Sequence, residues 1–149
     1  MISYKKAEQK DLGEIMEVIS DVKTSKQEES KKIITERIEQ GQLLCVVADN
    51  KIIGFLGWNK DFQSNPEYWY LEQITIQKDY RGKGIGQNFV KYFLQICHDE
   101  KVKKLYAHVQ KHNIRSLKMF SNVGGKINTE LDGCVQGEIT VEFELRNFF

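Results

Sequence analysis

Residues 70–86 of the chain read YLEQITIQKDYRGKGIG, a β-rich run that leads into three closely spaced glycines. Residues 68–77 are rich in aromatic and β-branched side chains, as is typical of a strand. After the glycines, apolar residues recur at helical spacing through Phe89, Phe93 and Cys97. The stretch therefore predicts a strand, a tight loop and an amphipathic helix, in that order.

The glycine loop has the chemistry of a phosphate site. The start of a helix has free N–H donors and a positive dipole end, and both favour an anion. Glycines let the backbone approach that anion closely because no Cβ intervenes. Positive charge at the edge of the site would come from Arg81 and Lys83. The N–H groups that can surround a pyrophosphate are those of Gly82, Lys83, Gly84, Ile85, Gly86 and Gln87. The alternative is a plain strand-to-helix turn with a solvated arginine and lysine.

Two better-known phosphate loops do not fit this spacing. The dinucleotide fingerprint has glycines at G-x-G-x-x-G, whereas here they are Gly82, Gly84 and Gly86. The P-loop needs Gly-Lys-Ser or Gly-Lys-Thr after a longer gap, and the sequence contains no such tripeptide.

The rest of the chain predicts a layered α/β fold. Helices are expected after Asp11 as N-cap, with Glu14 in the first turn, over Glu28–Gln40 and over Ser116–Val123. The expected strands are 2–6, 43–49, 52–59, 104–109 and 138–145, with a short further strand near 126–130. This order places antiparallel strands early and a β-α-β crossover in the middle. No linker, repeat or low-complexity run divides the chain, so we expect one domain over residues 1–149.

Composition disfavours several classes of function. The chain has 22 basic and 21 acidic side chains and a formal net charge of +1, which argues against a nucleic-acid protein that relies on a strong positive field. The sequence has no long apolar span and no signal-peptide pattern, so we expect a cytoplasmic protein without a membrane partner. Cys45, Cys97 and Cys134 are scattered, which indicates neither a disulfide framework nor a metal site, and the first two are expected in the core.

A second motif accompanies the glycine loop. Asn113-x-x-Ser116 is followed by Met119-Phe120 and then by Gly124. Together with residues 70–86, it resembles the GNAT superfamily of acetyl-CoA-dependent N-acetyltransferases. The family signature is arginine or glutamine, two residues, glycine, one residue, and glycine or alanine. Its second motif is Asn-x-x-Ser/Ala with a tyrosine and a glycine after it. The two motifs cover about a third of the chain, and the order of elements matches over nearly all of it.

The resemblance implies a fold and a co-substrate. The fold would be a mixed, mostly antiparallel central sheet with helices on both faces and a splayed parallel strand pair that holds CoA. Acetyl-CoA would be the co-substrate, without a metal, and its pyrophosphate would lie on residues 82–87. The main chain at Ile74 and Ile76 would bond the pantetheine arm, and Asn113 and Ser116 would touch the far side of CoA.

The resemblance also bears on the proton transfers of amide formation. Glu72 matches a carboxylate that is a proposed base in polyamine acetyltransferases, while an exposed strand carboxylate is the alternative reading. Phe120 stands where the family usually has a tyrosine; it cannot donate a proton, and we expect it to face the thioester. Tyr106 is one substitute for that tyrosine. Solvated or structural roles are expected for the histidines, which are His98, His108 and His112.

The expected reaction moves an acetyl group from acetyl-CoA directly to a primary amine in a ternary complex. Carboxylates at Asp61, Glu67 and Glu72 favour a small cationic amine as acceptor. Aromatic residues expected to border it are Trp58, Phe62, Tyr68 and Trp69. The alternative reading of these residues is a hydrophobic lid or core edge with solvated acids. One alternative is a non-catalytic acyl-CoA-binding or sensor module on the same fold, motivated by Phe120. The other is an unrelated α/β domain that holds a different phosphate. The oligomeric state stays open, with a homodimer as one option.

Overall fold

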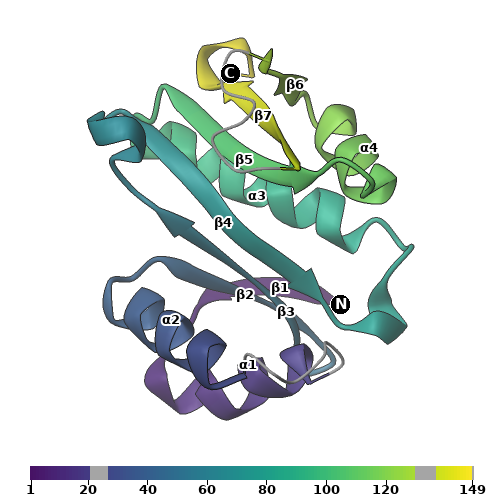
Figure 1. The fold of residues 1–149 in the computed structure, drawn as a ribbon. Helices are drawn as coiled ribbons and strands as arrows, with labels where there is room; N and C mark the ends of the chain where they lie inside the picture. Colours follow the sequence, from purple (N-terminus) through teal and green to yellow (C-terminus); the bar gives the residue numbers. More distant parts are fainter. Residues whose placement is uncertain (21–26, 130–136, 149) are drawn as a thin grey trace. The chain divides into compact units, whose positions relative to one another are not determined.

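The computed structural model describes residues 1–20, 27–129 and 137–148. These residues form four α-helices and seven strands in the predicted order (Figure 1). Their bounds are β1 Ile2–Lys6, α1 Leu12–Ile19, α2 Gln27–Glu39, β2 Leu43–Ala48, β3 Lys51–Asn59, β4 Tyr68–Ile76, α3 Ile85–Asp99, β5 Lys104–Gln110, α4 Ile114–Asn122, β6 Lys126–Ile127 and β7 Glu138–Glu144.

The strands are hydrogen-bonded in the order β1-β2-β3-β4-β5-β7-β6. Strand β4 runs parallel to β5, whereas β1–β2, β2–β3, β5–β7 and β6–β7 are antiparallel. The predicted mixed, mostly antiparallel sheet with one parallel pair is therefore confirmed. The parallel register runs from Tyr68 opposite Lys104 to Leu71 opposite Ala107. Both strands continue past its end.

The chain divides into two compact units that share β4. The first unit contains Met1–Trp58 and Gln73–Ile85, and the second contains Asn59–Glu72 and Gly86–Phe149. The second half of β4 therefore belongs with β1, β2 and β3, and its first half belongs with β5, β6 and β7.

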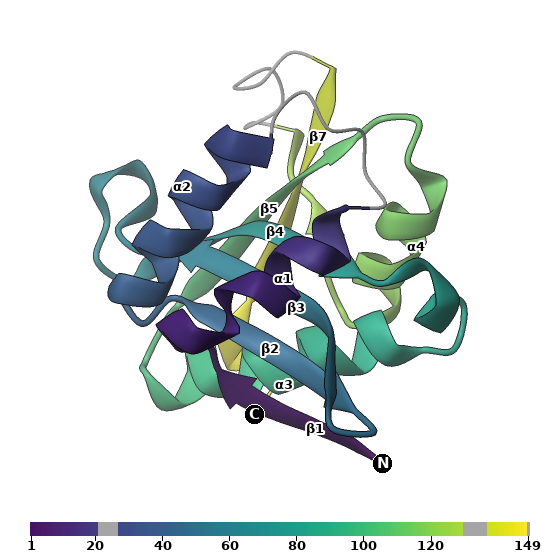
Figure 2. The same cartoon turned by 90° about the horizontal axis from the view of Figure 1, so that it is seen from below.

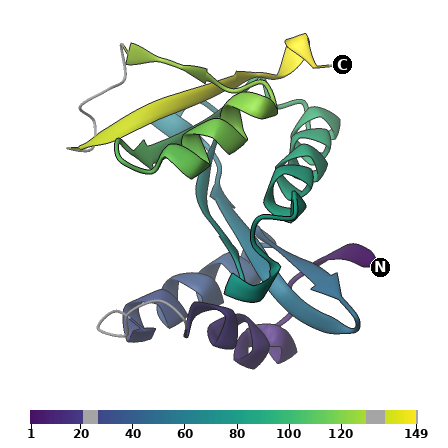
Figure 3. The same cartoon turned by 90° about the vertical axis from the view of Figure 1, so that its right-hand side faces the viewer.

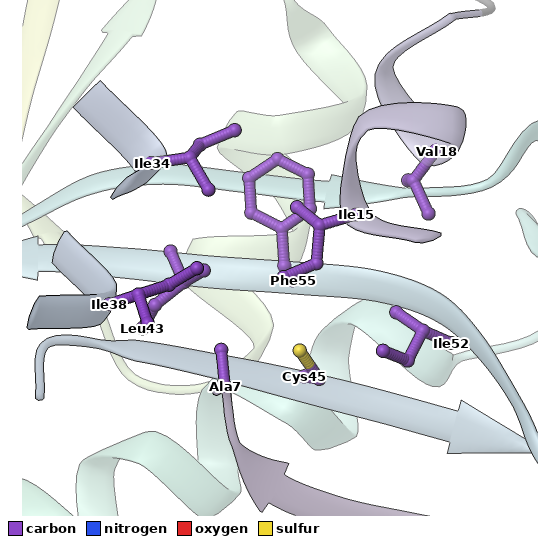
Figure 4. Packing of buried hydrophobic residues seen from close by; sticks show 9 residues of the cluster. All are labelled: Ala7, Ile15, Val18, Ile34, Ile38, Leu43, Cys45, Ile52 and Phe55. Carbon is purple, nitrogen blue, oxygen red and sulfur yellow. The ribbon is translucent and has the colours of Figure 1, made fainter. Parts of the chain in front are cut away.

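In the first unit, α1 and α2 cover one face of β1, β2 and β3 (Figure 2). The helices contribute apolar residues at i, i+3 and i, i+4 spacing, which places them on one helix face. Figure 4 shows these side chains meeting those of the strands. The buried cluster consists of Ala7, Ile15, Val18, Ile34, Ile38, Leu43, Cys45, Ile52 and Phe55.

Two local predictions in the first unit have different outcomes. The expected antiparallel pairing of the early strands is confirmed for β2 and β3. Their turn residues, Asp49 and Asn50, have φ of 51° and 62°, as in the two-residue turns that suit right-handed strand twist. Asp11 lies at the N-cap of α1, but its side chain does not bond that helix. Its carboxylate instead accepts the N–H of Glu8 at 2.8 Å and the ammonium of Lys5 at 2.9 Å. Asp11 therefore fixes the entry to the helix rather than its first turn.

In the second unit, α3 and α4 pack on the same face of the sheet (Figure 3). Trp69, Leu105 and Phe143 are neighbours in the strand register, so their side chains share one face. Phe93 of α3 lies 6.3 Å from Trp69, and Phe120 of α4 lies 5.9 Å from Phe143, between ring centroids. Because strand side chains alternate, the opposite face carries the aromatic and charged residues of β4, β5 and β7.

The cysteines that the structure describes are buried thiols, as predicted. Cys45 and Cys97 are each 0% exposed and unbonded to another sulfur. Burial raises the pKa of Cys45 to about 12 and also raises that of Cys97. Neither thiol therefore becomes a thiolate near neutral pH. Cys134 lies outside the described residues.

Candidate active site

The glycine loop has the conformation that its sequence predicts. Gly82 and Gly84 have φ of +77° and +79°, in the left-handed region that favours glycine. Helix α3 begins at Ile85, directly after the second of them. A Cβ on either glycine would meet no heavy atom within 4 Å, so the space beside the backbone is open. The loop thus presents an accessible helix start, the arrangement that binds anions in proteins.

The two basic residues of the loop have local partners. Arg81 Nε donates a hydrogen bond of 2.7 Å to the carbonyl oxygen of Ile76, which ties the loop back to the end of β4. The Lys83 ammonium lies 5.6 Å from the centroid of the Tyr80 ring. Both Ile74 and Ile76 lie beyond the residues of β4 that pair with β5. The resemblance assigned the main chain of Ile76 to the pantetheine arm. The carbonyl of Ile76 accepts the hydrogen bond from Arg81.

The spacing of Asn113 and Ser116 has a structural explanation. Asn113 is the N-cap of α4, and its side-chain oxygen accepts the backbone N–H of Ser116 at 3.1 Å. An Asn-x-x-Ser spacing places the cap three residues before the N–H that it satisfies. From the other end of α4, the Asn122 amide reaches the side-chain oxygen of Gln87 at 3.4 Å. The second motif therefore begins α4 and links it to the first turn of α3.

Glu72 is held by a defined hydrogen bond. The side-chain amide of Asn59, the last residue of β3, donates to a Glu72 carboxylate oxygen at 2.7 Å. Glu72 is partly buried on β4, so it is more than a freely solvated strand carboxylate. An oriented, partly buried carboxylate has the chemistry of a general base.

An aromatic cluster surrounds Phe62 on the face of β4 and β5 that also carries Glu72. Phe62 stacks on Tyr70, with ring centroids 5.2 Å apart and 12° between the planes. It also contacts Tyr106 at 4.9 Å and the edge of His108 at 6.2 Å. Tyr68 meets Tyr106 edge-on at 5.6 Å. Aromatic faces of this kind bind organic cations.

Carboxylates outnumber cations on this face. The Lys104 ammonium lies 3.6 Å from Glu142 and 3.8 Å from Glu144, and it also lies 5.8 Å from the centre of the Tyr68 ring. The carboxylates that alternate on this face are Glu72, Glu138, Glu142 and Glu144. The excess of negative charge favours a positively charged ligand.

The structure divides these residues between the two readings of the acceptor side. Trp69 is a core residue, buried against Phe93 on the helix-covered face, away from the aromatic cluster. Glu67 forms an exposed ion pair with Lys103 at 3.3 Å, as expected of a solvated acid. Trp58 is 3% exposed and belongs to the first unit. Of the four predicted aromatic residues, Phe62 and Tyr68 do lie on the open face, which is the face of β4 and β5 opposite α3 and α4.

The expectations for the missing tyrosine also change. Phe120 is 4% exposed, with its ring edge-on to Phe143, so it is a core residue rather than a side chain facing the thioester. Tyr106 is a poor substitute for the missing tyrosine because its hydroxyl is hydrogen-bonded to Glu142. Burial is the largest cause that raises the pKa of Tyr106, and this hydrogen bond is the next. His108, for which a solvated or structural role was expected, has a Glu138 carboxylate oxygen 3.7 Å from its Nδ1.

Sequence reasoning missed Asn59, Tyr70, His108 and Glu138. The first signal that could have found three of them is the period of two. In residues 68–72 of β4 and throughout β5 and β7, the even-numbered positions carry tyrosine, histidine and polar side chains, and the odd-numbered ones carry apolar side chains. What the sequence lacks is the pairing between strands, which brings His108 to Tyr70 across 38 residues and to Glu138 across 30.

Two further properties concern the described ranges only. Within residues 1–20, 27–129 and 137–148, no group of three or more His, Cys, Asp or Glu side chains could hold a metal ion. In the same ranges, no helix combines the length and apolar character that a membrane crossing requires.

Comparisons with known proteins agree with this geometry. The chain resembles the probable spermine N(1)-acetyltransferase of Bacillus subtilis subsp. natto (strain BEST195), with 32% identity over 69 residues, which are 46% of this chain and 45% of that protein. It resembles the thialysine N-epsilon-acetyltransferase of Bos taurus with 31% identity over 64 residues, 43% of this chain and 38% of the other. These matches thus span less than half of each curated relative.

Solved structures show the same fold over nearly the whole chain. An acetyltransferase of the GNAT family from Bacillus cereus ATCC 10987 superposes with a TM-score of 0.76 and 23% identity, over 97% of both chains. The PaiA N-acetyltransferase of Thermoplasma acidophilum, solved with coenzyme A, gives a TM-score of 0.79 at 17% identity, over 97% of this chain and 99% of the other. A sequence model of the acetyltransferase (GNAT) family matches residues 12–124. The chain therefore belongs to the GNAT family of acetyltransferases.

Proposed function

We propose that this protein transfers the acetyl group of acetyl-CoA directly to a small cationic amine, with Glu72 as the general base. The observation that carries the proposal is the 2.7 Å hydrogen bond from Asn59 to Glu72, on a face lined with aromatic rings and carboxylates. A family member needs CoA on one side of a reacting amine and a base on the other. The described residues supply a candidate for each.

The CoA pyrophosphate would bind at the glycine loop. Backbone N–H groups from Gly82 to Gln87 lie at the start of α3, and the positive φ of Gly82 and Gly84 turns the backbone there without a side chain in the way. Lys83 would add positive charge at the edge. Asn113 and Ser116 would contact CoA through α4, which Asn113 caps.

The acceptor amine must lose a proton before it attacks the thioester carbon. Glu72 would accept that proton, directly or through a water molecule. The amine nitrogen then forms a bond to the carbonyl carbon, the C–S bond breaks, and its electron pair goes to sulfur. Of the cysteines, those in the described residues are Cys45 and Cys97. Both are buried thiols with raised pKa values, so neither supplies a nucleophile for an acyl-enzyme.

The acceptor would be a small cation. The open face of the second unit combines Phe62, Tyr70 and Tyr106 with an excess of carboxylates, and both features attract an ammonium group. Two of the similar proteins are named for spermine and thialysine, which supports an aliphatic amine.

The test is CoA thiol release from acetyl-CoA over a panel of aliphatic diamines, polyamines, side-chain amines of amino acids, and peptide N-termini. We expect release with small aliphatic amines and little with peptides. Calorimetric titration with CoA accompanies the panel. CoA binding without release on any amine would favour a non-catalytic sensor, the alternative motivated by Phe120. Absence of CoA binding would contradict the proposal altogether.

A further inference from the structure

Tyr70, His108 and Glu138 form a connected chain of polar groups across three strands of the second unit. The Tyr70 hydroxyl lies 3.1 Å from Nδ1 of His108, and a Glu138 carboxylate oxygen lies 3.7 Å from the same nitrogen. The His108 side chain is 8% exposed. Phe62 packs on both rings, face to face with Tyr70 and edge-on to His108. Packing therefore fixes the geometry of these polar groups.

Glu138 determines which atom carries the proton between Tyr70 and His108. A carboxylate 3.7 Å away favours a proton on Nδ1 over a lone pair there. Nδ1–H then donates to the Tyr70 oxygen, which leaves the hydroxyl proton of Tyr70 for another acceptor. The other ring nitrogen, Nε2, is buried and has no hydrogen-bond partner among the described residues. A proton on Nε2 would therefore be a buried donor without an acceptor, which proteins rarely contain.

The Tyr70 hydroxyl stays protonated over the pH range in which amines are acetylated. Burial, with smaller effects of Glu138 and Glu72, raises its pKa to about 12. A phenol in this state donates a hydrogen bond but does not ionise. Tyr106 differs, because its hydroxyl is already bonded to Glu142. Phe120 has no hydroxyl to offer.

Tyr70 lies next to the proposed base. Tyr70 and Glu72 are on the same face of β4, two residues apart, which corresponds to about 7 Å along a strand. The paired part of β4 ends at Leu71, between them. The backbone positions of Tyr70 and the proposed base are thus one strand period apart on one face.

We propose that Tyr70 donates a hydrogen bond to the sulfur atom that leaves the thioester, and that His108 and Glu138 are positioning residues that keep this proton available. The inference rests on the proposed acetyl transfer. As the amine nitrogen bonds to the carbonyl carbon, the C–S electron pair moves to sulfur. The products are the amide, CoA thiolate stabilised by the Tyr70 hydroxyl, Glu72 carrying the proton that the ammonium lost before attack, and the second proton of the nitrogen, which passes to solvent water as the C–S bond breaks. Tyr70 keeps its own proton throughout.

The first arm of the test compares Tyr70→Phe with Tyr92→Phe. Both changes remove one hydroxyl, but the Tyr92 ring is 39% exposed on α3 and lies outside the proposed site. We expect Tyr70→Phe to lower kcat roughly tenfold or more with little change in KM for acetyl-CoA, because the bond forms in the transition state. Tyr92→Phe should lower kcat less than about threefold. Equal losses, or an unchanged kcat in Tyr70→Phe, would overturn the proposal.

The second arm is a spectrum of the histidine ring nitrogens in nitrogen-15-labelled protein. We expect the proton of neutral His108 on Nδ1 in the parent protein and a shift toward Nε2 in Glu138→Gln. This readout does not depend on turnover. An active enzyme with His108 protonated on Nε2 would overturn this inference alone. A protein inactive on every amine, with the proton on Nδ1, would instead contradict the proposed function.

Discussion

The side-chain amide of Asn59 donates a 2.7 Å hydrogen bond to the carboxylate of Glu72, which joins the end of β3 to the middle of β4. Both residues belong to the second unit. The donor is a neutral amide, so this bond orients the carboxylate and adds no positive charge beside it.

Asn59→Ala should therefore reduce acetyl transfer. The change removes a hydrogen bond that orients the carboxylate, and misplacement of a catalytic group lowers the rate steeply. We expect kcat/KM to fall roughly tenfold. The control is Asn128→Ala, which removes a similar 3.0 Å bond from an asparagine amide to Glu142. Comparable losses in the two variants would mean that Asn59 acts on general packing rather than through Glu72.

Glu72→Gln should remove the base and keep the size of the side chain. We expect kcat/KM to fall on the order of 10²-fold, and the acid limb of the pH–rate profile to change. Glu67→Gln serves as the matched control, since Glu67 lies in the exposed ion pair with Lys103. Rates for Glu72→Gln that equal the parent's at every pH would exclude Glu72 from the mechanism.

Gly84→Glu should weaken CoA binding. The change places bulk and a negative charge where the pyrophosphate is proposed to lie, in a residue with φ of +79°. Gly41→Glu is the control, because Gly41 has φ of +71° and likewise has no heavy atom within 4 Å of a built Cβ. Both variants carry the left-handed backbone strain, about 1–2 kcal/mol. Calorimetry should show weaker CoA binding for Gly84→Glu alone; equal affinity in the two would show that the phosphates bind elsewhere.

Most of the fold could be predicted because its signals are local. The period of 3.6 in Phe89, Phe93 and Cys97 and the turn at Asn50 each depend on a few neighbouring residues. The cap at Asp11 was mispredicted because its partner is a lysine on β1 as well as a nearby N–H. A capping residue can satisfy any donor within reach, and the sequence does not say which.

The site was harder to predict for a related reason. The glycine loop is a continuous segment, so its conformation follows from its own residues. The polar chain from Tyr70 to Glu138 depends on the register of three strands, and a shift by one residue would send every side chain to the other face. Phe120 was placed by resemblance, but its exposure depends on the packing of α4 on Phe143.

Asp11→Asn should change how stability depends on pH. Burial raises the pKa of Asp11, but the Glu8 N–H and the Lys5 ammonium outweigh burial and hold the pKa below its ordinary value. A carboxyl whose pKa is lowered in the folded state stabilises the fold at pH values above its unfolded-state pKa, which is about 3.9. This stabilisation is lost as the pH falls through the folded-state pKa. Urea unfolding should show a lower free energy of unfolding for Asp11→Asn than for the parent at pH 7. This difference between the two proteins should become smaller below pH 4. The exposed Asp99→Asn is the control, and a loss that is constant with pH would contradict the assignment.

Phe120→Tyr should destabilise the protein and leave its turnover nearly unchanged. The Phe120 ring is 4% exposed and packs edge-on against Phe143 at 5.9 Å, so an added hydroxyl would enter the core. A buried hydroxyl without a partner costs about 1–3 kcal/mol. We expect a loss of this size in the free energy of unfolding measured with urea, and a smaller one for Phe62→Tyr, whose ring is partly exposed.

Unchanged stability and faster turnover in Phe120→Tyr would revise the proposed catalytic site. A tyrosine that stabilised the departing thiolate should raise turnover, although thiolate is a good leaving group, with a conjugate acid near pKa 8.5, so that the gain would be about tenfold or less. A variant as stable as the parent and faster would show that the ring at this position turns toward the thioester. It would also weaken the role proposed for Tyr70, because the two hydroxyls would compete for one sulfur. Combining Tyr70→Phe with Phe120→Tyr separates the cases: recovery of the lost kcat in the double variant would mean that either hydroxyl can reach the sulfur, and no recovery would leave Tyr70 as its donor.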